Sequence, residues 1–137
     1  MSRQDDVCKE ETLDPEDWES MRTLGHRMLD DMLDYAHTLR ERPIWQHAPL
    51  SVKERFQDGP PIEPETPDEV YREYLEYIRP YQLGNSHPRF WGWIAGTGTI
   101  MSTLAEMLAT ATDSVSGSFS YLSNNYVEMQ VLDWCKS

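Results

Sequence analysis

The segment from His87 to Met107 contains the residues whose types and spacing best suit ligand binding. Three aromatic residues, Phe90, Trp91 and Trp93, fall within four positions, and the run Gly96-Thr97-Gly98-Thr99 follows them. Rings at alternating positions favour a short extended segment, and glycines allow positive φ or a close backbone approach. We expect these three rings to form a surface that faces something other than its own chain. The plainer interpretation is that the rings are core residues and that the glycine-threonine run is a turn capping a helix.

Two histidine-aspartate pairs have a spacing that could hold a metal ion. His26 precedes Asp30 by four residues and Asp34 precedes His37 by three, so each pair shares one face of a helix. No further ligands cluster with them in the sequence. We interpret both pairs as part of a solvated helix face with weak ion pairs, and we predict no metal site.

Other catalytic patterns receive little support. Although His87 and several serines are present, the sequence has no GxSxG or HExxH arrangement. The glycine-threonine run lacks the Gly-Lys-Ser/Thr ending of a phosphate-binding loop. Cys8 and Cys135 form no CxxC pair, which indicates free thiols in a reducing compartment.

The overall composition limits the classes of partner. The 137 residues suit one domain and include 24 acidic and 12 basic side chains, which give a formal net charge of -12. Such a surface repels phosphate backbones, so we expect neither nucleic acid nor an anionic membrane as a partner. No apolar run approaches the ~20 residues that span a bilayer, and the first residues lack the apolar part of a signal peptide. We therefore expect a cytoplasmic protein.

Two helices are expected to position the first half of the chain. Asp14 is a candidate N-cap, and Pro15 suits the first position of a long amphipathic helix that ends near Arg40. A second helix follows the capping-box sequence Thr66-Pro67-Asp68-Glu69 and runs to Arg79.

The remaining segments are a strap, a loop and two more helices. Prolines exclude regular structure from most of residues 42–67, but large apolar residues are interleaved there, so we expect an ordered strap across a surface. A third helix should begin near residues 99–100 and be followed by a serine-rich loop over residues 113–125. A fourth helix, beginning near residues 124–125, is apolar around its whole circumference, which is typical of a buried helix.

The order of these motifs resembles the N-terminal region of the pyridoxal-phosphate-dependent group II amino-acid decarboxylases. That family includes aromatic amino-acid, tyrosine, histidine and glutamate decarboxylases. The resemblance covers Pro15 to Trp134: after the helix and the strap come a Pro-Glu-type helix start at Glu63 to Glu69 and the signature His87-Pro88-Arg89-Phe90-Trp91-Gly92-Trp93. Leu104-Ala105-Glu106-Met107-Leu108 and a glutamate-bearing helix ending in Asp-Trp complete the order. The Trp-Gly-Trp triplet with its glycine-threonine run looks closest to bacterial members.

The resemblance implies a mostly α fold, the N-terminal helical segment of a fold-type I enzyme without its large α/β cofactor domain. It implies an acidic tail over residues 1–12, dimer-interlocking helices and the strap over 13–86, and a pocket wall with the start of the large domain over 87–137. The implied activity is decarboxylation of a small amino acid by a homodimer with pyridoxal phosphate. An aromatic wall would orient the substrate and exclude water.

The resemblance also assigns two groups of site residues. The positions that match the substrate-pocket wall are Trp93, Ile94, Ala95, Gly96 and Thr97, and those that match a loop reaching the partner's site are Val115 and Gly117, with Phe119 nearby. Two departures from the family pattern leave the substrate open. The aromatic-amine enzymes have Phe-Pro-Thr where this chain has Ile94-Ala95-Gly96, and Ser123-Asn124-Asn125 replaces Ser-Pro-Ala.

The lysine that binds the cofactor in this family has no counterpart here. Lys9, Lys53 and Lys136 are the lysines of the chain, and none follows a histidine as the family's His-Lys pattern requires. We therefore expect this chain alone to hold no pyridoxal phosphate and to be inactive, as a truncated piece completed by a separately encoded large domain or a longer gene product. The alternatives are a stand-alone helical dimerisation or interaction module without catalysis, and a plain acidic four-helix domain.

Overall fold

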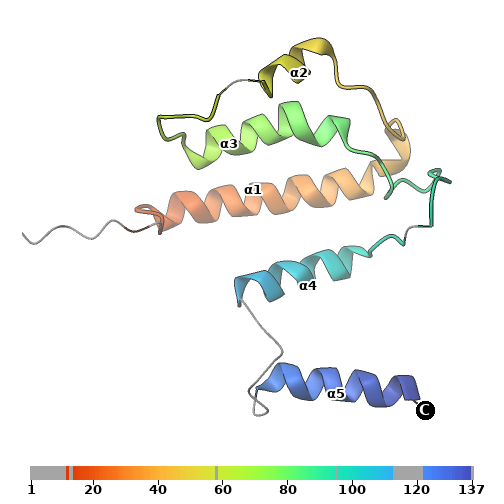
Figure 1. Cartoon of the computed structure of the whole chain (residues 1–137). Helices are drawn as coiled ribbons and strands as arrows, with labels where there is room; N and C mark the ends of the chain where they lie inside the picture. Colours follow the sequence, from red (N-terminus) through yellow and green to blue (C-terminus); the bar gives the residue numbers. More distant parts are fainter. Residues whose placement is uncertain (1–11, 13, 58, 95, 113–121, 137) are drawn as a thin grey trace, which may run out of the picture. The chain divides into compact units, whose positions relative to one another are not determined.

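The computed structural model describes residues 12, 14–57, 59–94, 96–112 and 122–136, and it is helical, with no strand within these ranges (Figure 1). The mostly α fold expected from the sequence is thereby confirmed. The chain divides into two units, residues 1–91 and 92–137, and each is described by itself. The α-helices are α1 (Trp18–His37), α2 (Leu50–Arg55), α3 (Pro67–Glu73), α4 (Ile100–Ala111) and α5 (Ser123–Lys136).

Helix α1 begins three residues later than the sequence predicts. Asp17, rather than Asp14, is the N-cap, because its Oδ1 accepts hydrogen bonds from the backbone N–H groups two and three residues ahead, at 3.0 and 3.1 Å. The helix therefore begins at Trp18 and not at Pro15. It ends at His37, and a single 3-10 turn follows over Leu39–Glu41. Aspartates on both sides of Pro15 offered two possible caps, and the later one is used.

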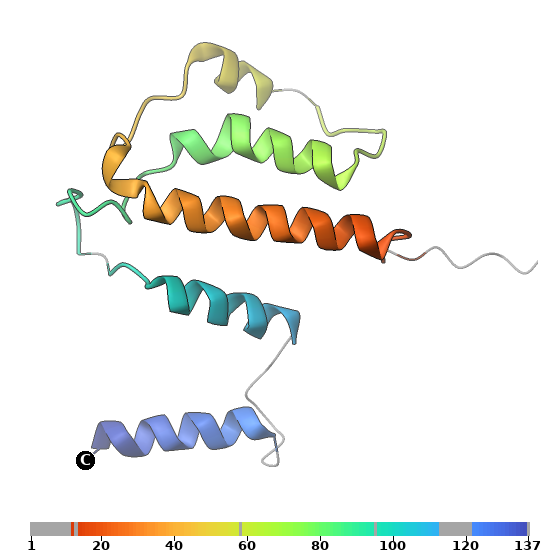
Figure 2. The same cartoon turned by 180° about the vertical axis from the view of Figure 1, so that it is seen from behind.

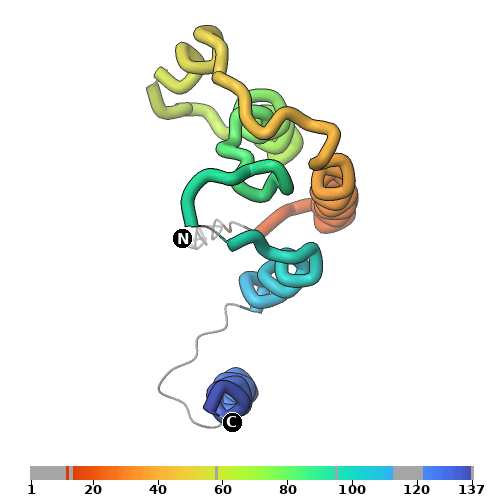
Figure 3. Tube along the Cα trace, turned by 90° about the vertical axis from the view of Figure 1, so that its right-hand side faces the viewer, coloured from red at the N-terminus to blue at the C-terminus, as the bar shows by residue number. Residues whose placement is uncertain are grey.

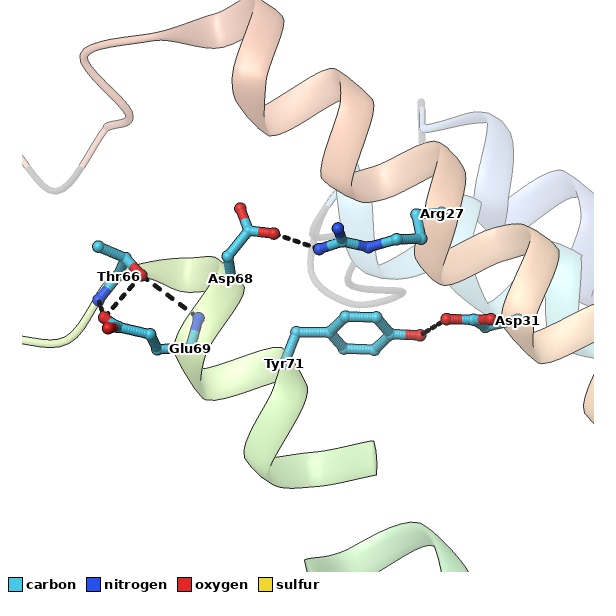
Figure 4. A network of polar contacts seen from close by, with 6 residues as sticks. All are labelled: Arg27, Asp31, Thr66, Asp68, Glu69 and Tyr71. Carbon is cyan, nitrogen blue, oxygen red and sulfur yellow. Dashed lines mark hydrogen bonds and ion pairs between the residues drawn. The ribbon is translucent and has the colours of Figure 1, made fainter. Parts of the chain in front are cut away.

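The capping box predicted for the second long helix is present. Thr66 Oγ1 accepts from the Glu69 backbone N–H at 3.3 Å, and Glu69 Oε2 accepts from the Thr66 N–H at 2.9 Å (Figure 4). The Thr66 hydroxyl also donates to Glu69 Oε2, at 2.7 Å, and the backbone N–H and the hydroxyl together lower the pKa of Glu69. The helical path continues past α3 as a π-helical turn, Tyr74–Ile78, and a 3-10 turn, Arg79–Tyr81.

Helices α1 and α3 lie side by side, as the opposite views in Figures 1 and 2 agree. Tyr71 of α3 is buried, and its hydroxyl donates to Asp31 Oδ2 of α1 at 2.7 Å (Figure 4). Burial and the adjacent Asp31 carboxylate raise the pKa of Tyr71 to about 12. Arg27 of α1 forms an ion pair with Asp68 of α3, and its guanidinium lies 5.7 Å from the centre of the Tyr71 ring. These contacts join α1 to α3.

The proline-rich strap contains one short helix. Figure 3 shows the strap as the orange-to-yellow tube that leaves the end of α1 and reaches α2. Helix α2 forms directly after Pro49, in a stretch that has no proline until Pro60. Val52 of α2 is buried, and Arg55 forms an ion pair with Glu73 of α3. This ion pair attaches α2 of the strap to α3.

The second unit contains α4 and α5, and neither helix has a buried side chain. Helix α5 begins at Ser123, one residue before the earliest predicted position. Its apolar circumference predicted a buried helix, but Trp134, Tyr126 and Val127 are each more than 60% exposed. The prediction of a buried helix is therefore wrong for the described residues. The apolar pattern shows which side chains would be stabilised by burial, but no described residue of this chain buries them. No helix in the described ranges has the length and apolar character needed to cross a membrane.

Candidate functional site

A buried turn at His87, within the first unit, leads into the aromatic segment. The His87 N–H donates to the Gly84 carbonyl at 2.9 Å, and the Phe90 N–H donates to the His87 carbonyl at 2.9 Å. His87 Nδ1 accepts from the Arg89 N–H at 3.0 Å, so the side chain closes a turn around Pro88 in the manner of an Asx turn. His87 is only 2% exposed. In the sequence His87 stands out in the family signature and as a histidine without a catalytic motif, and the structure gives it a local role in this turn.

The proton arrangement of His87 follows from this turn. Because Nδ1 accepts a hydrogen bond, the proton of the neutral ring lies on Nε2. Nε2 is buried and has no hydrogen-bond partner among the residues that the structure describes. A buried N–H group without an acceptor is unfavourable, so the placement of His87 Nε2 destabilises the folded chain.

A close backbone approach positions this turn. Gly84 has φ +73°, and a Cβ atom built on it would lie 1.6 Å from the carbonyl oxygen of Ile44 in the strap. Only glycine fits there without movement of the backbone. This contact could not be predicted from the sequence, because a single glycine in the loop before His87 does not reveal which distant segment it touches.

The predicted pocket wall belongs to the second unit. Trp93 has φ +58°, the left-handed region that non-glycine residues seldom adopt, and its side chain is 76% exposed. Ile94 is fully exposed, and Gly96 and Thr97 are exposed as well. The expected extended segment is therefore wrong at Trp93. Backbone strain of this kind concentrates at functional sites, where the surroundings hold it in place.

Four of the predicted site residues lie outside the described part of the chain. They are Ala95 of the wall and the three loop positions Val115, Gly117 and Phe119. The structure therefore describes the wall at Trp93, Ile94, Gly96 and Thr97.

The end of the glycine-threonine run caps α4, as the plainer interpretation proposed. Thr99 Oγ1 accepts from the Ser102 N–H at 3.1 Å, and Ser102 Oγ accepts from the Thr99 N–H at 2.8 Å. A Cβ atom at Gly98 would lie 3.0 Å from Ser102 Oγ, so a small residue suits that position. Gly98 and Thr99 thus serve the helix start, while the wall residues precede them.

The described residues offer no fit for a metal ion or for pyridoxal phosphate. No group of three or more histidine, cysteine, aspartate or glutamate side chains in these ranges could hold a metal. Lys53 on α2 is exposed, and Lys136 Nζ lies 3.3 Å from Asp133 Oδ1 in an exposed ion pair. Neither amine has the enclosed setting that a covalently bound cofactor requires, and Lys9 lies outside the described residues. That the chain alone holds no cofactor stays a prediction.

Comparison with known proteins finds similar sequences among plant enzymes. Tryptophan decarboxylase 2 of Oryza sativa subsp. japonica is 31% identical over 129 residues, 91% of this chain and 26% of that protein. Phenylacetaldehyde synthase of Arabidopsis thaliana is 31% identical over 126 residues, 89% of this chain and 25% of that protein. Aromatic-L-amino-acid decarboxylase of Catharanthus roseus is 29% identical over 124 residues. The chain spans about a quarter of the length of the curated relatives it matches. No protein-family model matches it.

Solved structures give the same likeness at the level of fold. The structure of Catharanthus roseus tryptophan decarboxylase in complex with L-tryptophan matches 89% of this chain and 27% of its own, with a TM-score of 0.73 and 27% identity. The match is to its N-terminal part. The structure of Rhodiola rosea 4-hydroxyphenylacetaldehyde synthase matches 73% of this chain and 22% of its own, with a TM-score of 0.60 and 20% identity, a likeness of fold alone.

Proposed function

We propose that this chain is the N-terminal part of a pyridoxal-phosphate-dependent group II amino-acid decarboxylase. The observation that carries the proposal is the structural match over 89% of the chain at 27% identity to tryptophan decarboxylase. Sequence similarity to decarboxylases over a comparable share of the chain supports it independently. The assignment to a bacterial-type member remains a proposal that rests on the Trp91-Gly92-Trp93 triplet and the following run alone.

In the proposed enzyme this chain contributes binding surface rather than the reacting group. Pyridoxal phosphate, held by other parts of the complete enzyme, supplies the electron sink for decarboxylation. The role of Trp93 is to present its ring to the substrate and to exclude water, which strengthens every polar interaction at the reacting centre. Its exposed ring and its left-handed backbone support this role.

The same proposal assigns the exposed helices to an interface between subunits. Helices α4 and α5 carry large apolar side chains at the surface, among them Met101, Leu108 and Trp134, each more than 60% exposed. Surfaces of this kind mark contacts with other protein. In a homodimer, or with a separately encoded large domain, these faces would be covered and the wall would border the active site. The location of the enzyme is proposed to be cytoplasmic.

The test is to isolate the natural gene product and to measure CO2 release from carboxyl-labelled amino acids after addition of pyridoxal phosphate. The panel contains tryptophan, tyrosine, phenylalanine, histidine and glutamate. We expect release from at least one of them. A product that contains this chain, binds the cofactor and releases CO2 from none of the five would contradict the proposal.

A matched pair of variants tests the wall. In the active product, Trp93→Ala should lower kcat/KM by about tenfold or more, because it removes an oriented ring and admits water. The free energy of unfolding should change by less than about 1 kcal/mol, since the ring is mostly exposed. Trp91→Ala is the control, because Trp91 is 93% exposed and lies outside the assigned wall. Equal effects of the two substitutions on kcat/KM would remove Trp93 from the site.

The exposed faces of α4 and α5 also suit the alternative of a stand-alone interaction module. The two functions differ in one measurable property. A module of this kind would associate with its partner and have no decarboxylase activity in any natural product that contains it. The CO2 assay therefore separates them.

A further inference from the structure

A small cavity in the first unit has an unusual lining for so acidic a protein. It has a volume of about 110 Å³ and lies between the end of α1, the start of the strap and the turn after the π-helical segment. Its lining includes Tyr35, Arg42, Ile44, Trp45, Arg79 and Gly84. Two arginines line it, and no aspartate or glutamate does. All of these residues belong to the first unit, and none belongs to the predicted pocket wall.

Neither cavity arginine forms an ion pair with a carboxylate within the described ranges, whereas some other arginines there do. Three such pairs are Arg22 with Glu19, Arg27 with Asp68, and Arg55 with Glu73. The chain has twice as many acidic as basic side chains, so carboxylates that could pair with an arginine are abundant. Two guanidinium groups in one cavity without a carboxylate therefore concentrate positive charge against the overall trend.

Arg42 is held in position but is not neutralised. Its Nε and Nη2 donate to the hydroxyl oxygen of Thr38 at 3.2 and 3.1 Å, and its guanidinium lies 4.8 Å from the centre of the Tyr35 ring. A neutral hydroxyl and a ring face orient the planar group, while further N–H donors stay available. Such a fixed guanidinium loses little entropy when it binds an anion.

Arg79 is half-buried, and its guanidinium has no hydrogen bond or ion pair with the side chains and carbonyl groups that the structure describes. The amide side chains nearby are already engaged, since Gln46 Nε2 donates to the Pro80 carbonyl at 3.1 Å and Gln82 Nε2 donates to the Ile78 carbonyl at 3.2 Å. The charge in the cavity is thus supplied by the two arginines.

We propose that this cavity binds a carboxylate group between the guanidinium groups of Arg42 and Arg79. A guanidinium matches a carboxylate with two parallel hydrogen bonds. The apolar and aromatic lining, from Ile44, Tyr35 and Trp45, suits the carbon that bears the carboxylate. The net charge of -12 opposes a doubly charged phosphate more strongly than a singly charged carboxylate. The carboxylate comes either from a small free acid or from an acidic side chain of a second copy of this chain.

The experiment is a nuclear magnetic resonance titration of the full 137-residue chain with sodium propionate, at constant ionic strength set with chloride. We expect saturable shifts of the Trp45 indole N–H and of the arginine Nε–H signals. Arg79→Gln should weaken binding by about tenfold or more, because a charge-assisted hydrogen bond is lost. Arg72→Gln is the matched control and should bind propionate like the parent chain, since Arg72 is exposed on α3 and does not line the cavity. Arg42→Gln is a second variant whose folding is checked first, because Arg42 also packs on Tyr35.

Sedimentation equilibrium then distinguishes the two sources of the carboxylate. If a second copy supplies it, propionate and Arg79→Gln will each weaken self-association, and if a free acid supplies it, propionate will bind without changing the mass. Either result supports the proposal. It is overturned if no saturable shift occurs and self-association does not depend on Arg79. It is also overturned if inorganic phosphate binds as tightly as propionate, which would indicate general anion attraction.

Discussion

At the scale of single residues, Gly84 is a position that leaves no room for a side chain. It combines a positive φ of +73° with a carbonyl oxygen of the strap 1.6 Å from the site of a Cβ atom. We expect Gly84→Ala to lower the free energy of unfolding by at least about 2 kcal/mol, because it adds left-handed strain and displaces the backbone of Ile44. Urea unfolding followed by circular dichroism measures this loss.

Gly25 provides the matched control for that substitution. It lies inside α1, and a Cβ atom there would meet nothing within 4 Å. Gly25→Ala should therefore raise the free energy of unfolding by about 0.5–1 kcal/mol, through reduced entropy of the unfolded chain. If both alanine variants unfold at the same urea concentration, the close approach of the strap to Gly84 is wrong.

Tyr71 gives the fold a dependence on alkaline pH. Its pKa is raised to about 12 in the folded chain, against about 10 for an unperturbed tyrosine. The unfolded chain therefore loses this proton first. The stabilisation is fully present below pH 10 and is lost as the pH rises through about 12, with a slope of about 1.4 kcal/mol per pH unit between these values.

Tyr71→Phe should remove that dependence and the hydrogen bond to Asp31. Below pH 10 we expect it to lower the free energy of unfolding by about 1–2 kcal/mol, because the acceptor is a charged carboxylate. The difference between the parent chain and the variant should shrink between pH 10 and 12, as measured by urea unfolding at each pH. Tyr126→Phe, at an exposed position of α5, is the control and should follow the parent chain. A constant difference across this range would contradict the raised pKa.

At the scale of secondary-structure elements, the capping box at the start of α3 is the best-defined local signal. We expect Thr66→Ala to lower the free energy of unfolding by about 1 kcal/mol, because the Glu69 backbone N–H loses its acceptor. Glu69→Gln should cost less, since an amide oxygen can still accept from the Thr66 N–H. Glu65→Gln tests charge alone at a neighbouring exposed position. Urea unfolding of each variant measures the loss. If Thr66→Ala and Glu65→Gln unfold at the same urea midpoint, the cap contributes nothing to stability.

Local signals explain why the long helices were predictable and some of their ends were not. The Thr66 box and the Thr99 cap each need only residues within one turn, and both were found from sequence. The start of α1 was misplaced because Asp14 and Asp17 both satisfy the same cap chemistry. The π-helical turn at Tyr74–Ile78 has no signal of comparable strength in the sequence, since its hydrogen bonds differ from those of an α-helix by a single residue.

The wall positions of the candidate site stay a prediction, and motif order is the sequence signal that suggested them. They came from a resemblance to a family, and the structure shows Trp93 and Ile94 of the wall to be exposed. The left-handed backbone of Trp93 could not be read from the sequence, since non-glycine residues rarely adopt it. Arg42 and Arg79 escaped notice for another reason. Two arginines far apart in sequence become a pair only when the strap and the turn fold onto the end of α1.

At the scale of the whole molecule, the two units differ in how much of their own surface they bury. The first unit has buried residues on α1, α2 and α3, namely Leu24, Val52 and Tyr71, whereas α4 and α5 have none. Helices of 12 and 14 residues are near the length at which an isolated helix is marginal in water. Because tertiary packing supplies most helical stability in proteins, we expect α4 and α5 to pack on a surface beyond the described residues of their own chain.

Hydrogen exchange of the isolated 137-residue chain measures this difference. We expect amides of α1 near Leu24 to exchange at least about 100-fold more slowly than amides at the centre of α5, because opening a packed helix costs several kcal/mol more than opening an unpacked one. In the natural gene product, contact with a second copy or a large domain should bring α5 to the protection of α1. The centre of α1 serves as the internal control in both samples. If α5 exchanged as slowly as α1 in the isolated monomer, its apolar faces would already be covered, and the need for an assembling surface would disappear.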